Sequence, residues 1–344
     1  MPPTRTEEPN AAGEPSRPER PPDLRPRASR PPWQSSDRRA DRYLPLPEAE
    51  RQGIGLCLSG AGFRAALFHL GALRRLDELQ ILGKLWTISS ISGGSIAAAH
   101  LATRLPWPVA GSTPDWGDYV AAPLREFARD RLRVRRRRLS ERFDRWFRPE
   151  AEPDRLTKAF ERGLTRLLIR DLPSIPAFVF AGADPTDPSV PRALASITQR
   201  FAGDHLAIEP VWRDHQTVLV SDGGGLFERD VAMEHEARAL GKRWLLSSFK
   251  TGTLKGAYWG IESARSRYDP LDRLGYSKRF AKTVLSSIRG GLDGLSLAEA
   301  IHLENHGYLV ADAAVETHVP ELIGRPAAPL AIPHPDWMDE SRAG

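Results

Sequence analysis

Cysteine is almost absent from this 344-residue chain: Cys57 is its single copy, so an internal disulfide bond and a cysteine-based zinc site are both excluded. Because Cys57 falls in the short apolar run Gly53–Leu58, we expect it to pack in the interior. Long apolar runs are also missing, and none approaches the ~20 residues that a membrane-spanning helix needs. The N-terminus lacks the apolar segment of a secretory signal. We therefore expect a cytoplasmic protein, soluble or bound at the periphery of a membrane.

Charge is distributed unevenly along the chain. The net charge is +5, yet residues 124–148 alone hold eleven arginines against four acidic residues, so the remainder is slightly acidic. A local basic patch of this kind does not indicate a nucleic-acid-binding protein. Residues 1–42 contain ten prolines and nine arginines but few large apolar side chains, and such a segment cannot offset its ordering entropy by burial. We interpret 1–42 as a disordered tail, 43–325 as one domain, and 326–344 as a C-terminal extension.

Short apolar runs alternate with helical patterns along the domain. Phe63–Leu79 and Ile96–Arg104 have the composition of helices. The apolar runs bounded by turn residues are Gly53–Leu58, Trp86–Ser90, Ala177–Ala181, Val218–Ser221 and Trp244–Phe249. This alternation predicts an α/β fold with a mainly parallel central sheet flanked by helices.

A glycine-rich turn, Ser59–Ala65, lies between the first predicted strand and helix. Its glycines allow backbone N–H groups to converge at a helix N-terminus, which suits an oxyanion hole. The same residues fit the G-x-G-x-x-A fingerprint of dinucleotide-binding proteins. That alternative requires an acidic residue at the end of the second strand, but Thr87–Ser95 contains none. The neighbouring sequence therefore favours the oxyanion hole.

A serine-containing turn follows the second predicted strand. Small residues around a serine between a strand and a helix are typical of a nucleophile elbow, because the turn is tight. Ser92 has Ser90 and Gly94 at the flanking positions, and Ser95 is its competitor. Ser92 stands at the strand exit, so we predict that it is the nucleophile. We expect Ser95 to lie in the first helical turn, where its hydroxyl satisfies a local backbone donor.

An aspartate ends the run Val218–Ser221 and is followed by three glycines. Carboxyl ends of parallel strands form the edge at which open α/β sheets place their sites. Asp-Gly-Gly alone is an ordinary turn. In combination with the serine and glycine turns, it makes Asp222 the candidate partner of Ser92.

The three motifs in this order resemble the patatin-like phospholipases, lipid acyl hydrolases with a Ser-Asp dyad and a three-layer fold. The resemblance spans about Gly53 to Pro320 and includes the sequence Leu303–Tyr308. It implies that Ser92 and Asp222 form the dyad, and that the oxyanion turn comprises Gly60, Ala61, Gly62 and Arg64. Ser90 and Ala61 stand where the family usually has glycine, and residues 182–217 match the family poorly.

The resemblance implies cleavage of fatty-acyl esters, with phospholipid or a related lipid as substrate and with no cofactor or metal. An impaired family member acting as a lipid- or membrane-binding module is the alternative that residues 182–217 suggest. A Ser-Asp-His triad would use His306, which falls in an Asn-His-Gly sequence typical of a turn or helix end. We expect His69 and His100 to serve packing or surface roles.

The arginine-rich segment 124–148 has a helical stripe of apolar and aromatic residues. Such a helix suits the surface of an anionic membrane. The residues we expect to contact it are Arg135, Arg136, Arg137, Arg138 and Trp146. A solvated helix whose apolar stripe packs on the core is the competing interpretation.

Overall fold

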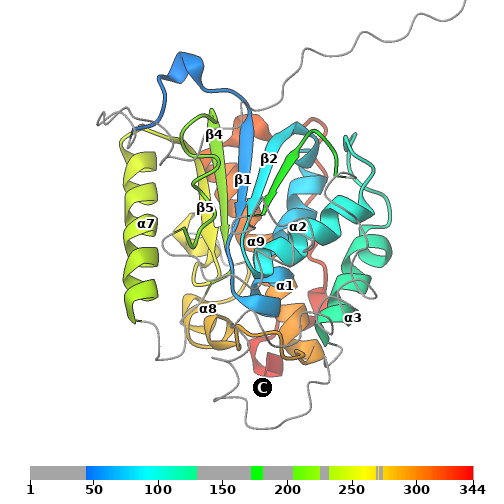
Figure 1. Ribbon diagram of the computed structural model, residues 1–344. Coiled ribbons are helices and arrows are strands. Elements are labelled where there is room, and N and C mark those ends of the chain that lie inside the picture. The colour runs from blue at the N-terminus through cyan, green and yellow to red at the C-terminus, as the bar shows by residue number, and fades with distance from the viewer. Residues whose placement is uncertain are drawn as a thin grey trace, which may run out of the picture. The chain divides into compact units, whose positions relative to one another are not determined.

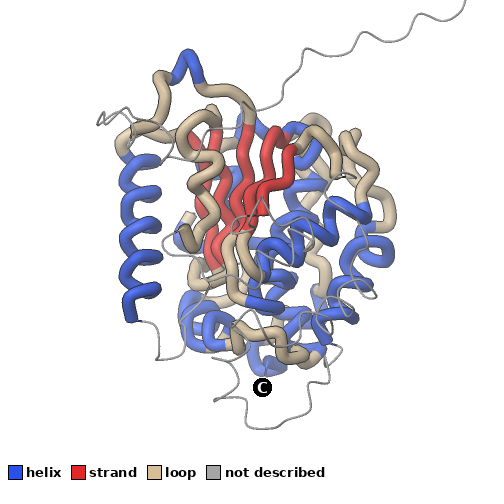
Figure 2. Tube along the Cα trace, viewed as in Figure 1, coloured by secondary structure: helices blue, strands red, loops and turns tan. Residues whose placement is uncertain are grey.

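The computed structural model describes residues 44–129, 172–180, 204–224, 232–268, 270 and 274–343, the side chains of 232–237 and 343 excepted. Its centre is a five-stranded sheet in the order β3-β2-β1-β4-β5, in which every neighbouring pair is parallel (Figures 1 and 2). The strands are β1 Ile54–Leu58, β2 Leu85–Ser90, β3 Ala177–Phe180, β4 Thr217–Asp222 and β5 Lys255–Gly260. The predicted α/β fold with a parallel sheet is confirmed.

Helices follow the strands as parallel connections require. Longer helices are α1 Gly62–Glu78, α2 Gly93–Arg104, α3 Ala122–Arg129, α7 Ala232–Lys250, α8 Lys278–Thr283 and α9 Leu297–His318. A π-helical turn precedes α3 at Gly117–Ala121. Short 3₁₀ segments lie at Glu48–Glu50, Leu82–Lys84, Arg265–Arg267, Leu285–Ser287, Pro320–Leu322, Pro335–Trp337 and Glu340–Ala343. None of the described helices is long and apolar enough to cross a bilayer.

The sheet is buried on both faces. Successive side chains of a strand point to opposite faces, so neighbouring residues of one strand join different apolar clusters. Leu56 and Leu58 of β1 join the larger core, whereas Cys57 joins a second, smaller cluster. Val218 and Val220 of β4 also belong to the second cluster. Cys57 is therefore a packing residue, as its sequence context predicts.

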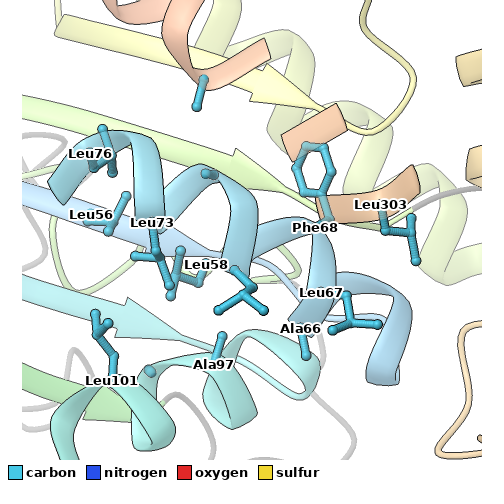
Figure 3. Packing of buried hydrophobic residues seen from close by; sticks show 14 of the residues in the cluster. Leu56, Leu58, Ala66, Leu67, Phe68, Leu73, Leu76, Ala97, Leu101 and Leu303 are labelled. Carbon is cyan, nitrogen blue, oxygen red and sulfur yellow. The ribbon is translucent and has the colours of Figure 1, made fainter. Parts of the chain in front are cut away.

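Helix α1 forms the centre of the larger core (Figure 3). Its apolar side chains meet β1 and α2 on one side and α9 on the other. The helices α1 and α9 approach so closely that a Cβ on Gly71 would overlap the carbonyl of Glu304, and one on Gly307 would overlap that of Phe68. These mid-helix glycines are retained for close packing despite their low helix propensity.

The second face of the sheet is covered by α7 and by the turns of residues 204–216. Trp212 and Leu206 of that segment and Leu245 of α7 pack on the strands. The atypical stretch 182–217 is thus described from Asp204 onward, where the Asp204 carboxylate accepts from the amides of Ile208 and Glu209.

Two sequence predictions need correction. The run Trp244–Phe249 is part of α7 and not a strand, and the fifth strand is Lys255–Gly260. Leu303–Tyr308 lies in the middle of α9, so His306 is neither in a turn nor at a helix end. Both errors arise because short apolar or polar runs have no period that distinguishes a helix from its alternatives.

The C-terminal residues pack on the domain and are tied to it by hydrogen bonds. Asn305 of α9 bonds the backbone of His334 through both its side-chain oxygen and its nitrogen. The Ser277 backbone and hydroxyl bind Glu340. The predicted tail 1–42 lies outside the described residues, as do 130–148, which hold Arg135, Arg136, Arg137, Arg138 and Trp146.

Candidate active site

Ser92 occupies a sharp turn between β2 and α2. Its backbone has φ 50° and ψ −118°, a conformation that side-chain-bearing residues adopt at a cost of about 1–3 kcal/mol. Strain of this kind is characteristic of serine nucleophile turns, where it lifts the hydroxyl out of the sheet. The side chain is partly exposed, and its hydroxyl forms no hydrogen bond with any described residue.

Ser95, the competing serine, is placed differently. It lies in the first turn of α2, as predicted, and it is fully buried. Its hydroxyl donates to the Ser90 hydroxyl at 3.2 Å, which joins the helix start to the end of β2. The two serines therefore differ in accessibility, backbone strain and hydrogen bonding, and each difference favours Ser92 as the reactive one.

The glycine turn after β1 lies directly against the serine turn. A Cβ on Gly60 would be 2.8 Å from the Ser92 Cβ, and one on Gly93 would overlap the Gly62 carbonyl. Both contacts exclude side chains, which explains the glycines at these two positions. Ala61 adopts an extended φ of 168° and needs no left-handed conformation.

In the two adjoining turns, the backbone amides of Gly60, Ala61, Gly62 and Gly93 have no acceptor among the described residues. Gly93 begins α2, and the first amides of a helix have no partner within it. The amide after a nucleophile and an amide of the neighbouring loop form the oxyanion hole of many serine hydrolases. Gly93 is a candidate donor that the sequence analysis did not identify.

Arg64 supports the glycine turn from inside the protein. Its side chain is 2% exposed, and Nη1 donates to the carbonyls of Ser286 and Ile288 at 2.8 and 2.5 Å. The adjoining Gly291 carbonyl accepts from the Phe63 amide. Arg64 thus fixes the loop that covers the start of α1. Burial, together with nearby Arg238, lowers the pKa of the guanidinium to about 10.

Asp222 ends β4 and is almost completely enclosed, with four donors around its carboxylate. Oδ1 accepts from the Ser59 hydroxyl at 3.0 Å, from the Gly224 amide at 3.2 Å and from Arg238 at 2.5 Å. Oδ2 accepts from the Tyr258 hydroxyl at 2.7 Å. Arg238 comes from α7, and nothing in the sequence around Asp222 indicates this partner.

The ionised form of Asp222 is strongly favoured. Burial alone would raise its pKa, but the charges of Arg238 and Lys242 and the hydrogen bonds from Tyr258 and Ser59 outweigh it. The pKa of the carboxyl therefore lies below its ordinary value. Lys242 reaches the same region, with its ammonium 5.0 Å from the centre of the Tyr258 ring.

Ser92 and Asp222 lie at the same edge of the sheet but on strands separated by β1. No hydrogen bond joins them in the part of the chain that the structure describes. The residue between them is Ser59, which follows β1, bonds Asp222 and precedes Gly60. The two residues of the predicted dyad thus flank the same turn, while Arg238 and Ser59 are bonded to the Asp222 carboxylate.

The histidines named from sequence are buried and engaged elsewhere. His69 Nε2 donates to the Ser59 carbonyl at 2.9 Å, so its Nδ1 accepts from the Ser221 hydroxyl at 2.8 Å. His306 Nε2 donates to the Ile261 carbonyl at 2.9 Å, and His100 Nε2 donates to a carbonyl before α3. Burial lowers the pKa of each imidazole to about 4. None of the three donates to Ser92 or Asp222.

The described residues contain no group of three or more histidine, cysteine or carboxylate side chains that could hold a metal ion. The end of β2 carries Ser90 and not a carboxylate, so the ribose contact of a dinucleotide site has no counterpart there. No model of a known protein family matches the chain, and no curated protein matches it.

Proposed function

We propose that the protein is a lipid acyl hydrolase that cleaves fatty-acyl esters, with Ser92 as nucleophile. One observation carries the proposal: among the described residues, a strained, partly exposed serine has an unbonded hydroxyl, and the two turns that meet at it contain backbone amides without an acceptor. Strain at a turn and unpaired donors are both costly, and they persist where chemistry uses them. The resemblance to patatin-like phospholipases supports the same reaction and suggests phospholipid as the substrate.

In the proposed reaction the Ser92 hydroxyl attacks the ester carbonyl and transfers its proton to a base. The carbonyl oxygen becomes an oxyanion that amides of the Gly60–Gly62 turn and the Gly93 amide stabilise. A single donor of this kind lowers the barrier of a comparable enzyme by about 2.7–4 kcal/mol. Collapse of the tetrahedral intermediate releases the alcohol and leaves an acyl-enzyme, which water then hydrolyses.

Asp222 is the proposed base, and its surroundings set a condition on that role. Its carboxylate is already occupied by Arg238, Ser59, Tyr258 and the Gly224 amide. In the reactive arrangement the Ser92 hydroxyl must therefore take the place of one donor on Oδ1. Arg238 is the donor that we expect to leave, because it comes from a helix and not from the sheet edge itself.

Labelling by a fluorophosphonate probe tests the proposal, since the probe reacts only with activated serines. We expect labelling of the wild type and of Ser95→Ala, and none of Ser92→Ala. Asp222→Asn should label slowly, and release of fatty acid from phospholipid should follow the same order. Wild-type protein that resists the probe and releases no fatty acid from any acyl ester would refute the proposal.

A second candidate function is a lipid-binding module without catalysis. The observation that favours it is the saturated carboxylate of Asp222, which receives four donors and none from Ser92. This candidate predicts binding to lipid vesicles and no reaction of Ser92 with the probe. The labelling experiment therefore discriminates between the two functions.

A further inference from the structure

Helix α7 has an outward face that the core does not cover. Its inward side chains, Leu245 and Ser248, are buried on the second face of the sheet. The exposed side chains recur at helical spacing along one side, and they include Leu240, Arg243, Trp244, Ser247 and Lys250. We call these five residues the α7 outer face. Figure 1 shows α7 beside the edge strand β5, away from α1, α2 and α9.

Large apolar side chains are unusually accessible on the α7 outer face. Leu240 is 59% exposed and Trp244 is 37% exposed. The Trp244 ring is held in place by an edge contact with Trp212, whose ring centre is 5.2 Å away. The face therefore presents a fixed aromatic ring and an aliphatic side chain to solvent, about one helical turn apart.

The charges of α7 are divided along its length, with Glu234 and Glu236 in its first turns and the cationic residues after them. From Arg238 to Lys250 the helix carries four cationic residues and no acidic residue. Arg243 and Lys250 are exposed on the outer face, whereas Arg238 and Lys242 point towards Asp222 and Tyr258. An anionic partner that accommodates apolar side chains complements this surface. Nucleic acid would satisfy the charge but would leave the two apolar side chains without a function.

We propose that the α7 outer face docks on an anionic phospholipid bilayer. A helix with Trp and Leu beside Lys and Arg lies in the interfacial plane, with its apolar side chains below the headgroups and its cations among them. This site is distinct from the arginine-rich segment 124–148. Docking here does not depend on Ser92 being catalytic. It would place α7, whose Arg238 bonds Asp222, in direct contact with the lipid.

Vesicle flotation of the full-length protein tests the proposal. We expect binding to vesicles of phosphatidylcholine mixed with phosphatidylglycerol, and much weaker binding to phosphatidylcholine alone. Leu240→Ser/Trp244→Ser should weaken binding about tenfold or more, since two apolar anchors are lost. Arg243→Ser/Lys250→Ser should weaken it and reduce its dependence on salt. Circular dichroism and thermal unfolding would establish that the variants fold.

A matched control removes one exposed apolar and one exposed cationic side chain elsewhere. Leu297 is 38% exposed at the start of α9, and Arg279 is exposed on α8. Leu297→Ser/Arg279→Ser should bind vesicles as the wild type does. The proposal is overturned if the α7 variants keep full vesicle binding. A variant with Arg135, Arg136, Arg137 and Arg138 changed to Ser would then show whether the arginine-rich segment is the membrane contact instead.

A site-specific probe gives a second, independent readout. Cys57 is buried, so an environment-sensitive dye on Ser247→Cys reports the α7 outer face alone. We expect a blue shift on addition of anionic vesicles, and no shift for the dye on Ser112→Cys, an exposed position near α2. No shift at Ser247, or a shift that nucleic acid produces and vesicles do not, would contradict docking on lipid.

Discussion

The ion pair between Asp222 and Arg238 is the feature whose energetic consequence can be worked out most fully. The two side chains are 1% and 11% exposed, and their closest atoms are 2.5 Å apart. Unit charges about 4 Å apart attract by about 4 kcal/mol at an effective dielectric constant near 20. Three further donors remain on the carboxylate when Arg238 is removed. We therefore expect the coupling between the two residues to be about 2–3 kcal/mol.

A double-mutant cycle measures this coupling directly. Urea unfolding at pH 7 would be compared for the wild type, Arg238→Gln, Asp222→Asn and the double variant. Arg238→Gln should lower the free energy of unfolding by about 3 kcal/mol, since it leaves a buried charge with fewer partners. The double variant should lose about 2–3 kcal/mol less than the sum of the two single changes.

Arg238→Lys is the matched control, because it keeps the charge and changes the geometry of the donor. It should cost less stability than Arg238→Gln. Loss of Arg238 also removes a charge that holds the pKa of Asp222 down, so that pKa should rise. The acid limb of any activity that requires ionised Asp222 should then move to higher pH. A coupling energy near zero, with an unchanged acid limb, would refute the electrostatic reasoning.

Two further predictions follow from buried groups. Burial lowers the pKa values of His69, His100 and His306 to about 4, so the folded protein holds these imidazoles neutral at pH 7. Each histidine therefore contributes about 3 kcal/mol of stability that is present above the unfolded pKa near 6.5 and is lost as pH falls towards 4. Urea unfolding across this pH range measures the loss. Gly307→Ala should lower the free energy of unfolding by about 3 kcal/mol or prevent folding, because the new Cβ would overlap a carbonyl of α1. Thermal unfolding would measure the loss. A variant as stable as the wild type would contradict the close packing of α1 and α9.

Two carboxyl groups oppose the effect of the histidines. Burial raises the pKa of Asp77 and of Asp204 to about 6, so their folded forms bind protons more readily than the unfolded chain between about pH 4 and 6. Three lowered histidines outweigh two raised aspartates, and the net loss from pH 7 to pH 4 should be about 4 kcal/mol. Stability that increases over this range would contradict the assignment of neutral, buried histidines.

Local sequence predicts the elements that carry the site because they obey simple patterns. β1, β2 and β4 are short apolar runs, and each is followed within three residues by a glycine of its turn. β5 was missed since its first residues, Lys255 and Gly256, are atypical of a strand. Trp244–Phe249 resembles a strand in sequence because so short an apolar run has no period that separates a strand from a helix.

The partners of the site residues are less predictable. Gly93 directly follows the predicted nucleophile, and the general rule for serine hydrolases identifies the amide at that position as a donor, but the sequence analysis does not use this rule for Gly93. Arg238 lies sixteen residues beyond Asp222 in the middle of a helix, and only the packing of α7 brings them together. One signal for the partner is present in the sequence: Arg238 and Lys242 are four residues apart, so both cations occupy one side of the helix.

Mass-spectrometric mapping of the residue that a fluorophosphonate modifies tests directly whether Ser92 is an activated nucleophile. We predict modification of Ser92 in the wild type and in Ser95→Ala, with none in Ser92→Ala. Modification at Ser95, or no modification of the folded wild type, would contradict it.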